Sequence, residues 1–356
     1  TEARPDAFLP HLAGSLNNQA NRLGDLGQHE KALEAITEAV RTYRHLTEAR
    51  PDAFLPDLAG SLNNQSTDLG ALGRHEEALE AITEAVDIRR RLAEARPDAF
   101  LPDLAMSLNN QAVRLGDLGQ HEKALEAITE AVRTYRHLTE ARPDAFLPHL
   151  AGSLNNQANR LGDLGQHEKA LEAITEAVRT FRHLAEARPD AFLPDLAGSL
   201  NNQSTDLGAL GRHEEALKAV TEAVRTYRRL AEARPDAFLP DLSMSLNNQA
   251  VQLGALGRHE EALEAITEAV DIRRRLAEAR PDAFLPDLAM SLNNQAIQQG
   301  ALGRHEKALE AITEAVRTYR HLVEIRPAIH QQELEQSLRV VAWLRGDNDN
   351  SDVPPV

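Results

Sequence analysis

Apolar and polar positions follow one another along this chain in a pattern that returns every 46 residues. In residues 1–46, one run of apolar positions from Leu12 to Leu23 and another from Ala32 to Leu46 have spacings of three and four residues. These spacings place each run on one stripe of an α-helix. The pattern therefore predicts two antiparallel helices in each 46-residue unit, joined by a tight turn.

Glycine and proline mark the ends of the two predicted helices. Gly27 is placed to end the first helix in a left-handed conformation, which glycine adopts without a steric penalty. Pro51 ends the second helix, because proline disfavours helical geometry in the residue before it. Pro10 is placed at the opening of a first helix, where a missing N–H is tolerated. We therefore expect a Pro-rich return loop between one helix pair and the next.

The fixed period predicts a solenoid, in which similar units stack and each contacts its neighbours. We expect one elongated all-α domain of seven helix-turn-helix repeats, at residues 1–46, 47–92, 93–138, 139–184, 185–230, 231–276 and 277–322. A capping helix over residues 323–345 should close the stack, because it keeps the apolar spacing of a first helix but has Arg339 and Val340 in place of the paired asparagines. Trp343 is expected to pack in this cap. The acidic, Pro-ended residues 346–356 are expected to be disordered.

The residues at the turn and on the second helix resemble a tetratricopeptide repeat. Gly27, Ala32 and Ala39 stand at that family's turn glycine and at its two small positions on the second helix. The chain is more similar still to the long variety found in kinesin light chains. There a Pro-Asp segment leads into a Leu-Asn-Asn helix, as in residues 55–64. The resemblance extends over all seven copies and implies a right-handed superhelix whose concave groove, lined by the first helices, binds peptides.

Differences among the seven copies gather on one face of the predicted first helix. The variable positions are 11, 14, 21, 22 and 25, and at about 100° per residue they lie on the side away from Leu12 and Leu16. The constant pair Asn17 and Asn18 lies on or beside this face. Because an amide offers both a donor and an acceptor to an extended backbone, we expect these asparagines to contact a partner while variable neighbours provide selectivity. The predicted partner-binding residues are Asn17, Asn18, Asn63, Asn64, Asn109, Asn110, Asn155, Asn156, Asn201, Asn202, Asn247, Asn248, Asn293 and Asn294, with Asn21, Thr67, Val113, Asn159, Thr205, Val251 and Ile297.

Three features of this face have alternative interpretations that the sequence leaves open. The repeated asparagines could form a hydrogen-bonded ladder between adjacent first helices, without any ligand. Arg22 and Asp68, at equivalent positions of neighbouring copies, could form an ion pair worth about 0–1 kcal/mol or could serve recognition. Gln19 stands where the family usually has leucine, and it could loosen the helix pair or form a hydrogen bond between copies.

Composition and charge argue against several other classes of function. The formal net charge of −16 argues against nucleic-acid binding, which requires a basic face. Cysteine is absent, and no apolar run approaches the roughly 20 residues of a membrane span. His29 and Glu30 lack the second histidine of a zinc-protease motif, so we expect the turn histidines to pack, with no metal and no cofactor. No nucleophile–base–acid set stands apart from the repeat, so we expect no enzyme.

These observations together predict a cytoplasmic, non-catalytic scaffold that binds a protein or an extended peptide in the concave groove. Two alternatives remain open: a ligand-sensing arm of a larger signalling ATPase or protease, and an array that self-associates through uncapped ends. Thr1 has the phase of a return loop, which indicates that the sequence begins inside a longer array or multidomain protein. Arginine exceeds lysine by 34 to 5, which indicates a GC-rich bacterial genome such as an actinobacterial one.

Overall fold

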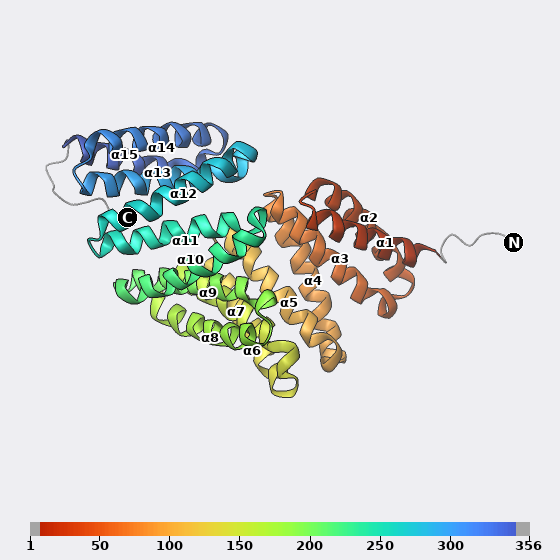
Figure 1. The fold of residues 1–356 in the computed structure, drawn as a ribbon. Helices are drawn as coiled ribbons and strands as arrows, with labels where there is room; N and C mark the ends of the chain where they lie inside the picture. Colours follow the sequence, from red (N-terminus) through yellow and green to blue (C-terminus); the bar gives the residue numbers. More distant parts are fainter. Residues whose placement is uncertain (1–7, 347–356) are drawn as a thin grey trace. The chain divides into compact units, whose positions relative to one another are not determined.

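The computed structural model describes residues 8–346, and the regular elements in that range are fifteen α-helices (Figure 1). This architecture confirms the prediction of an all-α chain built from stacked 46-residue helix pairs. The chain divides into two compact units, residues 1–180 and residues 181–356, and each is described by itself.

Odd-numbered helices are the first helices of the repeats and even-numbered helices are the second. The first unit contains α1 Leu9–Asp25, α2 His29–Ala49, α3 Pro51–Ala71, α4 His75–Ala95, α5 Pro97–Asp117, α6 His121–Ala141 and α7 Pro143–Asp163, and α8 His167–Ala187 runs across the boundary. The second unit contains α9 Pro189–Ala209, α10 His213–Ala233, α11 Pro235–Ala255, α12 His259–Ala279, α13 Pro281–Ala301, α14 His305–Ile325 and α15 Pro327–Arg345.

Within each unit, a first helix packs against two second helices, its own and that of the preceding copy. In this way α3 packs against α4 and against α2, and α3 also touches α1 and α5. Among the described residues, the backbones of adjacent second helices such as α2 and α4 do not come as close as those of adjacent first helices. Adjacent first helices therefore lie closer together than adjacent second helices, which puts the first helices on the inner side of the local curvature.

The core between the helices consists of alanine and branched aliphatic side chains. Ala78, Ile82 and Ala85 of α4 are fully buried, and Leu58 and Leu62 of α3 pack in the same cluster. Alanine at these positions allows the helix axes to approach closely, while leucine and isoleucine fill the remaining space. The two apolar stripes predicted from the sequence, one on each helix of a pair, are the surfaces that pack together in this core.

The turn inside each helix pair is closed by a glycine in the left-handed conformation. Gly27 has φ 71°, its N–H donates to Gly24 O at 2.8 Å, and Gln28 N donates to Leu23 O at 2.9 Å. These bonds satisfy carbonyl groups that the end of α1 would otherwise leave without donors. The equivalent glycines of the other six copies have φ between 68° and 72°, so the prediction for this turn is confirmed.

The expected Pro-rich return loop is wrong. Arg50 alone separates α2 from α3, and Pro51 is the first residue of α3, where its missing N–H carries no cost. Pro56 therefore lies inside the helix instead of opening it. Tertiary packing explains the longer helix, because Phe54 is buried and the Arg50 guanidinium lies over its ring at 4.9 Å from the centroid. In α1, the described helix begins at Leu9.

The altered eighth segment forms α15, which packs against α14 and α13. Trp343 packs in the core cluster of this end and lies against Gly300, as expected for a residue of the cap. Gly346 ends α15 with φ 73°. Residues 347–356, which make up nearly all of the tail expected to be disordered, lie outside the described range.

Two glycines of the first unit should respond oppositely to alanine. Gly119→Ala places a Cβ on a residue with φ 68° and should lower stability by about 1–2 kcal/mol. Gly152→Ala lies inside α7 with no heavy atom within 4 Å of an added Cβ, and should raise stability by up to about 1 kcal/mol. Urea denaturation followed by helical circular dichroism measures both, and shifts of the same sign would contradict the assignment of the turn.

Candidate partner-binding surface

Within each of the two units, the first asparagine of most constant pairs is held in a ladder between adjacent first helices. Asn63 Oδ1 accepts hydrogen bonds from Ser107 Oγ at 3.2 Å and from Asn110 Nδ2 at 3.1 Å, and Asn63 is only 6% exposed. The same Asn-to-Asn bond is present at Asn17 with Asn64, Asn109 with Asn156, Asn201 with Asn248, and Asn247 with Asn294. The ladder considered as the ligand-free alternative is therefore present, and within each unit it ties adjacent first helices from α1 to α7 and from α9 to α13.

The second asparagine of each pair is less engaged. Asn64 is half-buried and donates through Nδ2 to the ladder. Its carbonyl oxygen takes no part in that bond. Asn18 is exposed and makes no hydrogen bond with any described residue. The position three residues further on is exposed at Asn21 and Thr67, half-buried at Val113, and almost fully buried at Ile297. The predicted binding residues thus divide into a buried ladder and a partly exposed edge.

Several residues of this edge come together around one cavity of the first unit. The cavity has a volume of about 790 Å³ and lies between α1 and α3. Its lining includes Asn18, Asn21, Asn64 and Thr67, which the sequence selected, and also Arg22, Asp25, His29 and Asp68. The structure therefore brings amides, a hydroxyl and both signs of charge to one hollow on the first-helix side.

The turn histidines bridge to the next copy through the variable positions. His29 Nδ1 lies 3.1 Å from Asp68 Oδ1, and His213 Nδ1 lies 3.0 Å from Gln252 Oε1 at the equivalent position. Where that position is arginine, the nearest carboxylate comes from three residues further on: Asp117 Oδ2 lies 3.7 Å from His75 Nδ1, which is too far for a hydrogen bond. Where position 22 is occupied by Asp68 or Gln252, the variable residue is therefore bonded to the turn histidine of the preceding copy.

The ion pair that was one of two interpretations of Arg22 and Asp68 does not form. Arg22 lies 3.9 Å from Asp25 of its own helix, and both side chains are largely exposed. Burial raises the pKa of Asp68, and the hydrogen bond with His29 acts in the opposite direction. The sequence missed this contact because the histidine is distant along the chain and comes from the turn of the preceding copy.

In several copies, the first glycine of the Leu-Gly-x-Leu-Gly segment lies beside a side chain from the next copy. Gly70 lies inside α3, and a Cβ added there would collide with the Arg114 guanidinium. Gly208 would collide in the same way with Gln252, at 2.6 Å from Nε2. A larger residue here would therefore require the end of the Arg114 or Gln252 side chain to move, and only the following glycine of the Leu-Gly-x-Leu-Gly segment closes the turn.

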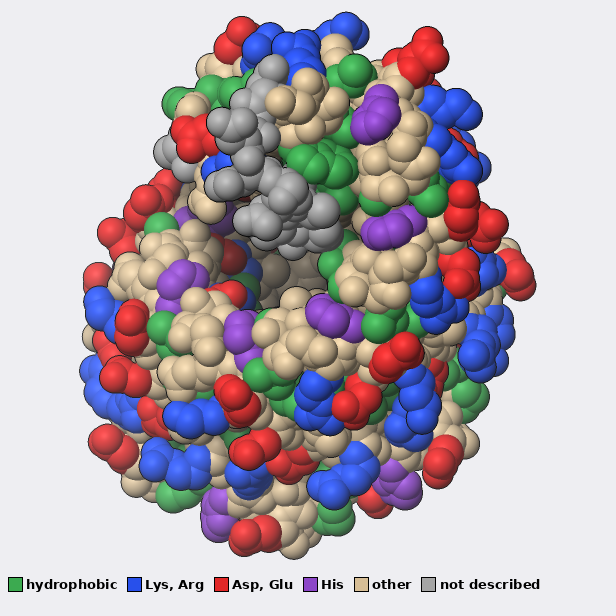
Figure 2. Space-filling view, turned by 90° about the vertical axis from the view of Figure 1, so that its left-hand side faces the viewer, with side chains coloured by type: hydrophobic (Ala, Val, Ile, Leu, Met, Phe, Trp, Pro, Cys, Tyr) green, Lys and Arg blue, Asp and Glu red, His purple; other side chains and the backbone are tan. Residues whose placement is uncertain are grey.

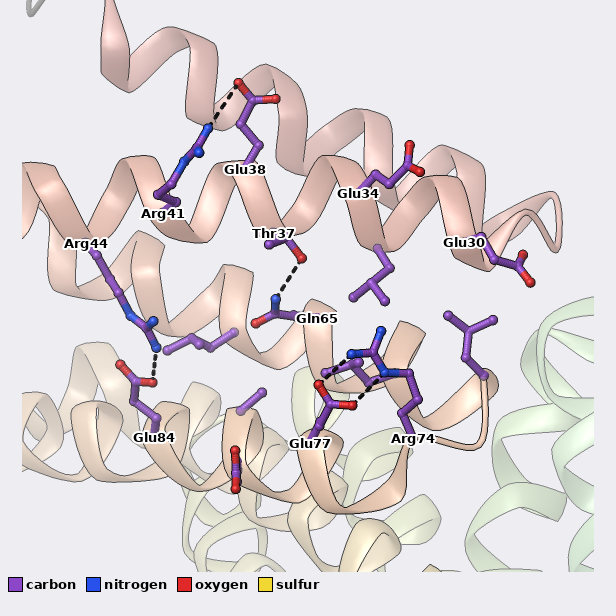
Figure 3. Close-up of a pocket in the computed structure, with 16 residues that line it drawn as sticks. Glu30, Glu34, Thr37, Glu38, Arg41, Arg44, Gln65, Arg74, Glu77 and Glu84 are labelled. Carbon is purple, nitrogen blue, oxygen red and sulfur yellow. Dashed lines mark hydrogen bonds and ion pairs between the residues drawn. The ribbon is translucent and has the colours of Figure 1, made fainter.

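A larger groove lies on the second-helix side of the first unit, between α2 and α4 (Figure 3). Its volume is about 1020 Å³, and Gln65 Nε2 donates to Thr37 Oγ1 at 3.0 Å across its floor. The bond resolves the alternatives for the glutamine, which joins one copy to the next. Arg44 pairs with Glu84, and Arg74 pairs with Glu77, so the main cations of the rim are already neutralised.

Two arginines are buried where the other copies have tyrosine or phenylalanine. Arg89 Nη1 donates to Asp103 O at 2.9 Å and to Ser107 Oγ, and Arg273 makes equivalent bonds to Asp287 O and Ser291. Burial lowers the pKa of both guanidinium groups. The sequence reasoning passed over this substitution, although Tyr43 at the equivalent position marks it as a break in an aromatic series.

Charge on the molecule is mixed. On the face drawn in Figure 2, acidic and basic side chains alternate and form no continuous basic patch. Among residues 8–346, no group of three or more histidine, aspartate or glutamate side chains is arranged to hold a metal ion. None of the described helices combines the length and apolarity needed to cross a membrane.

Two family models match the chain, and both recognise the helix pair. A tetratricopeptide-repeat model matches residues 58–98 and 196–236. The model of anaphase-promoting complex subunit 5 matches residues 11–50, 94–151, 138–188, 228–285 and 277–324. Residues 11–50 and 58–98 are almost the same part of two successive copies, so the two models describe one repeat. The chain belongs to the tetratricopeptide-repeat proteins, whose fold generally serves protein interaction.

Solved structures with similar folds include RapI in its apo form, with a TM-score of 0.61 and 14% identity over 88% of this chain and 99% of that chain. BtubC (BKLC) from P. vanneervenii has a TM-score of 0.55 and 22% identity over 70% of this chain and 92% of its own. A putative kinesin light chain from Podosopora anserina has a TM-score of 0.47 and 18% identity over 66% and 99% of the two chains. At identities below 25%, the first two show the fold alone. No curated protein matches.

The ladder can be tested separately from the exposed edge. Asn63→Ala removes the acceptor of two buried donors and should lower stability by about 1–3 kcal/mol. Asn18→Ala removes an exposed amide and should change stability by less than about 0.5 kcal/mol. Chemical denaturation of the two variants measures the difference, and equal losses would contradict the division into ladder and edge.

Asp68→Asn should stabilise the chain in a pH-dependent way. Because the pKa of Asp68 is raised in the folded state, folding favours the protonated carboxyl. The stability that this carboxyl contributes is therefore present at acidic pH and is lost as the pH rises through the folded-state pKa. Asparagine keeps an acceptor for His29 without a charge, and should raise the melting temperature at pH 7 by about 1–3 °C. The difference should shrink toward pH 4. The exposed Asp25→Asn serves as the control, and a lower melting temperature for Asp68→Asn at pH 7 would contradict the role of desolvation.

Proposed function

We propose that this chain is a non-catalytic scaffold that holds extended peptide segments of other proteins along its first helices. The observation that carries this proposal is the 790 Å³ cavity lined by Asn18, Asn21, Asn64 and Thr67. A preformed hollow of this kind orders few side chains on binding, so little conformational entropy opposes the partner.

The amides of the edge supply the chemistry that an extended backbone requires. Asn18 offers an N–H donor and a carbonyl acceptor to any sequence, because backbone groups are the same in every peptide. Asn64 offers its carbonyl oxygen and its second N–H, since the ladder uses only one N–H of its amide. The ladder supports this role, because it fixes the orientation of the second asparagine before a partner arrives.

Selectivity among peptides comes from the neighbouring variable residues. Arg22, Asp25 and Asp68 place charges of both signs at the cavity, and Thr67 provides a hydroxyl. Binding in this hollow is favoured over the larger groove between α2 and α4, whose arginines are already paired with glutamates. The first-helix side also lies on the inner side of the local curvature, where one peptide can contact several copies.

Peptides selected from a random display library against the wild-type chain test the proposal. The triple variant Asn18→Ala/Asn21→Ala/Thr67→Ala should bind the selected peptides at least tenfold more weakly, since each lost hydrogen bond costs about 0.5–1.5 kcal/mol. Helical circular dichroism should remain unchanged, because none of the three side chains belongs to the ladder.

The matched control is Glu34→Ala, which lines the groove between the second helices. It should leave the dissociation constant unchanged. If Glu34→Ala weakened binding and the triple variant did not, the partner would lie on the second-helix side and the proposal would be wrong.

A further inference from the structure

The groove between α2 and α4 is a second hollow of the first unit, and the proposed function does not use it (Figure 3). It stays open, with a volume of about 1020 Å³, because the backbones of these two second helices do not come close to one another. Its lining extends along α2 from Glu30 to Arg44, a rise of about 21 Å at 1.5 Å per residue. This length matches an α-helix of about four turns.

The floor of this groove is apolar. Leu62 and Leu69 of α3 are buried beneath it, whereas Leu33 of α2 and Leu72 of the following turn line it and are only half-buried. The two half-buried leucines therefore offer apolar surface that a partner can cover. Burial of that surface would favour binding, because apolar area leaves water.

The two rims of the groove are acidic. The lining contains six glutamates and three arginines, a net charge of −3. All three arginines are paired with glutamates of the same lining. Glu30, Glu34 and Glu80 have no ion pair with any described residue. An apolar floor thus lies between an α2 rim and an α4 rim whose unmatched charge is negative.

The neighbouring groove between α4 and α6 has a different charge. In its lining, Glu126 and Glu130 are offset by Arg90 and Lys123, so the lining is neutral. Lys123 stands at the position that Glu77 has in the preceding copy. The groove that follows along α6 is intermediate, with three glutamates and one arginine. Among these three grooves, the one between α2 and α4 is the most acidic and the largest.

We propose that the groove between α2 and α4 binds an amphipathic α-helix of a second partner, with leucine-like residues on one face and lysine or arginine on both flanks. The apolar face covers Leu33 and Leu72, and the flanking cations pair with Glu30 and Glu34 on one rim and with Glu80 on the other. A helix suits this floor better than an extended peptide, because a helix satisfies its own backbone groups and presents only side chains to the leucines.

The helix site is separate from the cavity of the proposed function. That cavity is lined by residues of α1, of α3 and of the turn between α1 and α2, and no residue of its lining belongs to this groove. One chain can therefore hold an extended peptide on its first-helix side and a basic helix on its second-helix side.

Cross-linking at a single introduced cysteine locates the helix, because the chain has no cysteine of its own. The peptide is a synthetic leucine–lysine amphipathic helix of about four turns, with a bromoacetyl group on a central flanking side chain. Thr37→Cys reports on this groove, and Thr83→Cys reports on the neutral groove. The two variants are matched, since each loses one bond to a glutamine. The reaction rate with the peptide, divided by the rate with bromoacetamide to correct for exposure, should be at least tenfold higher at Thr37→Cys.

The acidic rims are tested in the Thr37→Cys chain. Glu30→Gln/Glu34→Gln/Glu80→Gln should lower the corrected rate about tenfold, because three ion pairs with the peptide are lost.

The matched control is Glu48→Gln/Glu94→Gln/Glu140→Gln, which removes the same charge from exposed residues outside the lining. It should leave the corrected rate unchanged. An equal fall in this control would mean that the peptide responds only to the net charge of the chain, and the proposal would be wrong.

Two further measurements separate this site from simple charge attraction and from the cavity on the first-helix side. A peptide with alanine in place of leucine remains helical and should react at least tenfold more slowly. Asn18→Ala/Asn21→Ala/Thr67→Ala, which should weaken extended peptides, should leave the corrected rate unchanged. Equal corrected rates at Thr37→Cys and Thr83→Cys, or a rate that survives loss of the three carboxylates or of the peptide leucines, would overturn the proposal.

Discussion

Stacking within each unit of this protein depends on an asparagine amide that lies between adjacent first helices. The first asparagine of a copy accepts hydrogen bonds from the next first helix, as Asn63 Oδ1 does from Ser107 and Asn110. A buried amide without a partner costs more than the bond itself contributes, so the ladder fixes the register of neighbouring helices. The alanine and leucine core supplies most of the stabilisation but would tolerate a shifted helix more readily, since apolar contact has no direction.

In the proposed function, one asparagine of the pair holds adjacent copies together and the second contacts the partner. One asparagine is committed to the neighbouring copy, and the second keeps part of its polar surface toward the cavity beside Asn18 and Asn64. Variation at the adjacent positions is partly compensated by the turn histidines, which lie at hydrogen-bond distance from Asp68 or Gln252 in the next copy. Copies can therefore differ at the surface without losing the contact that joins them.

The last helix shows what happens when the ladder is incomplete. At α15, apolar side chains replace the donors, and Asn293 Oδ1 remains buried without one. Every internal repeat of a solenoid presents a surface made for its neighbour, and α15 covers that surface by apolar packing alone.

The sequence by itself determined the helix pairs, their period and the turn at Gly27, because spacings of three and four and a left-handed glycine act within a few residues. It also selected the asparagine face, since a constant pair beside variable neighbours is visible without coordinates. Only the tertiary structure decided which asparagine is buried, because that depends on a serine and an asparagine 44 and 47 residues away. The start of α3 at Pro51 and the pairing of His29 with Asp68 were likewise decided by packing between copies, where Phe54 is buried and the turn reaches the next first helix.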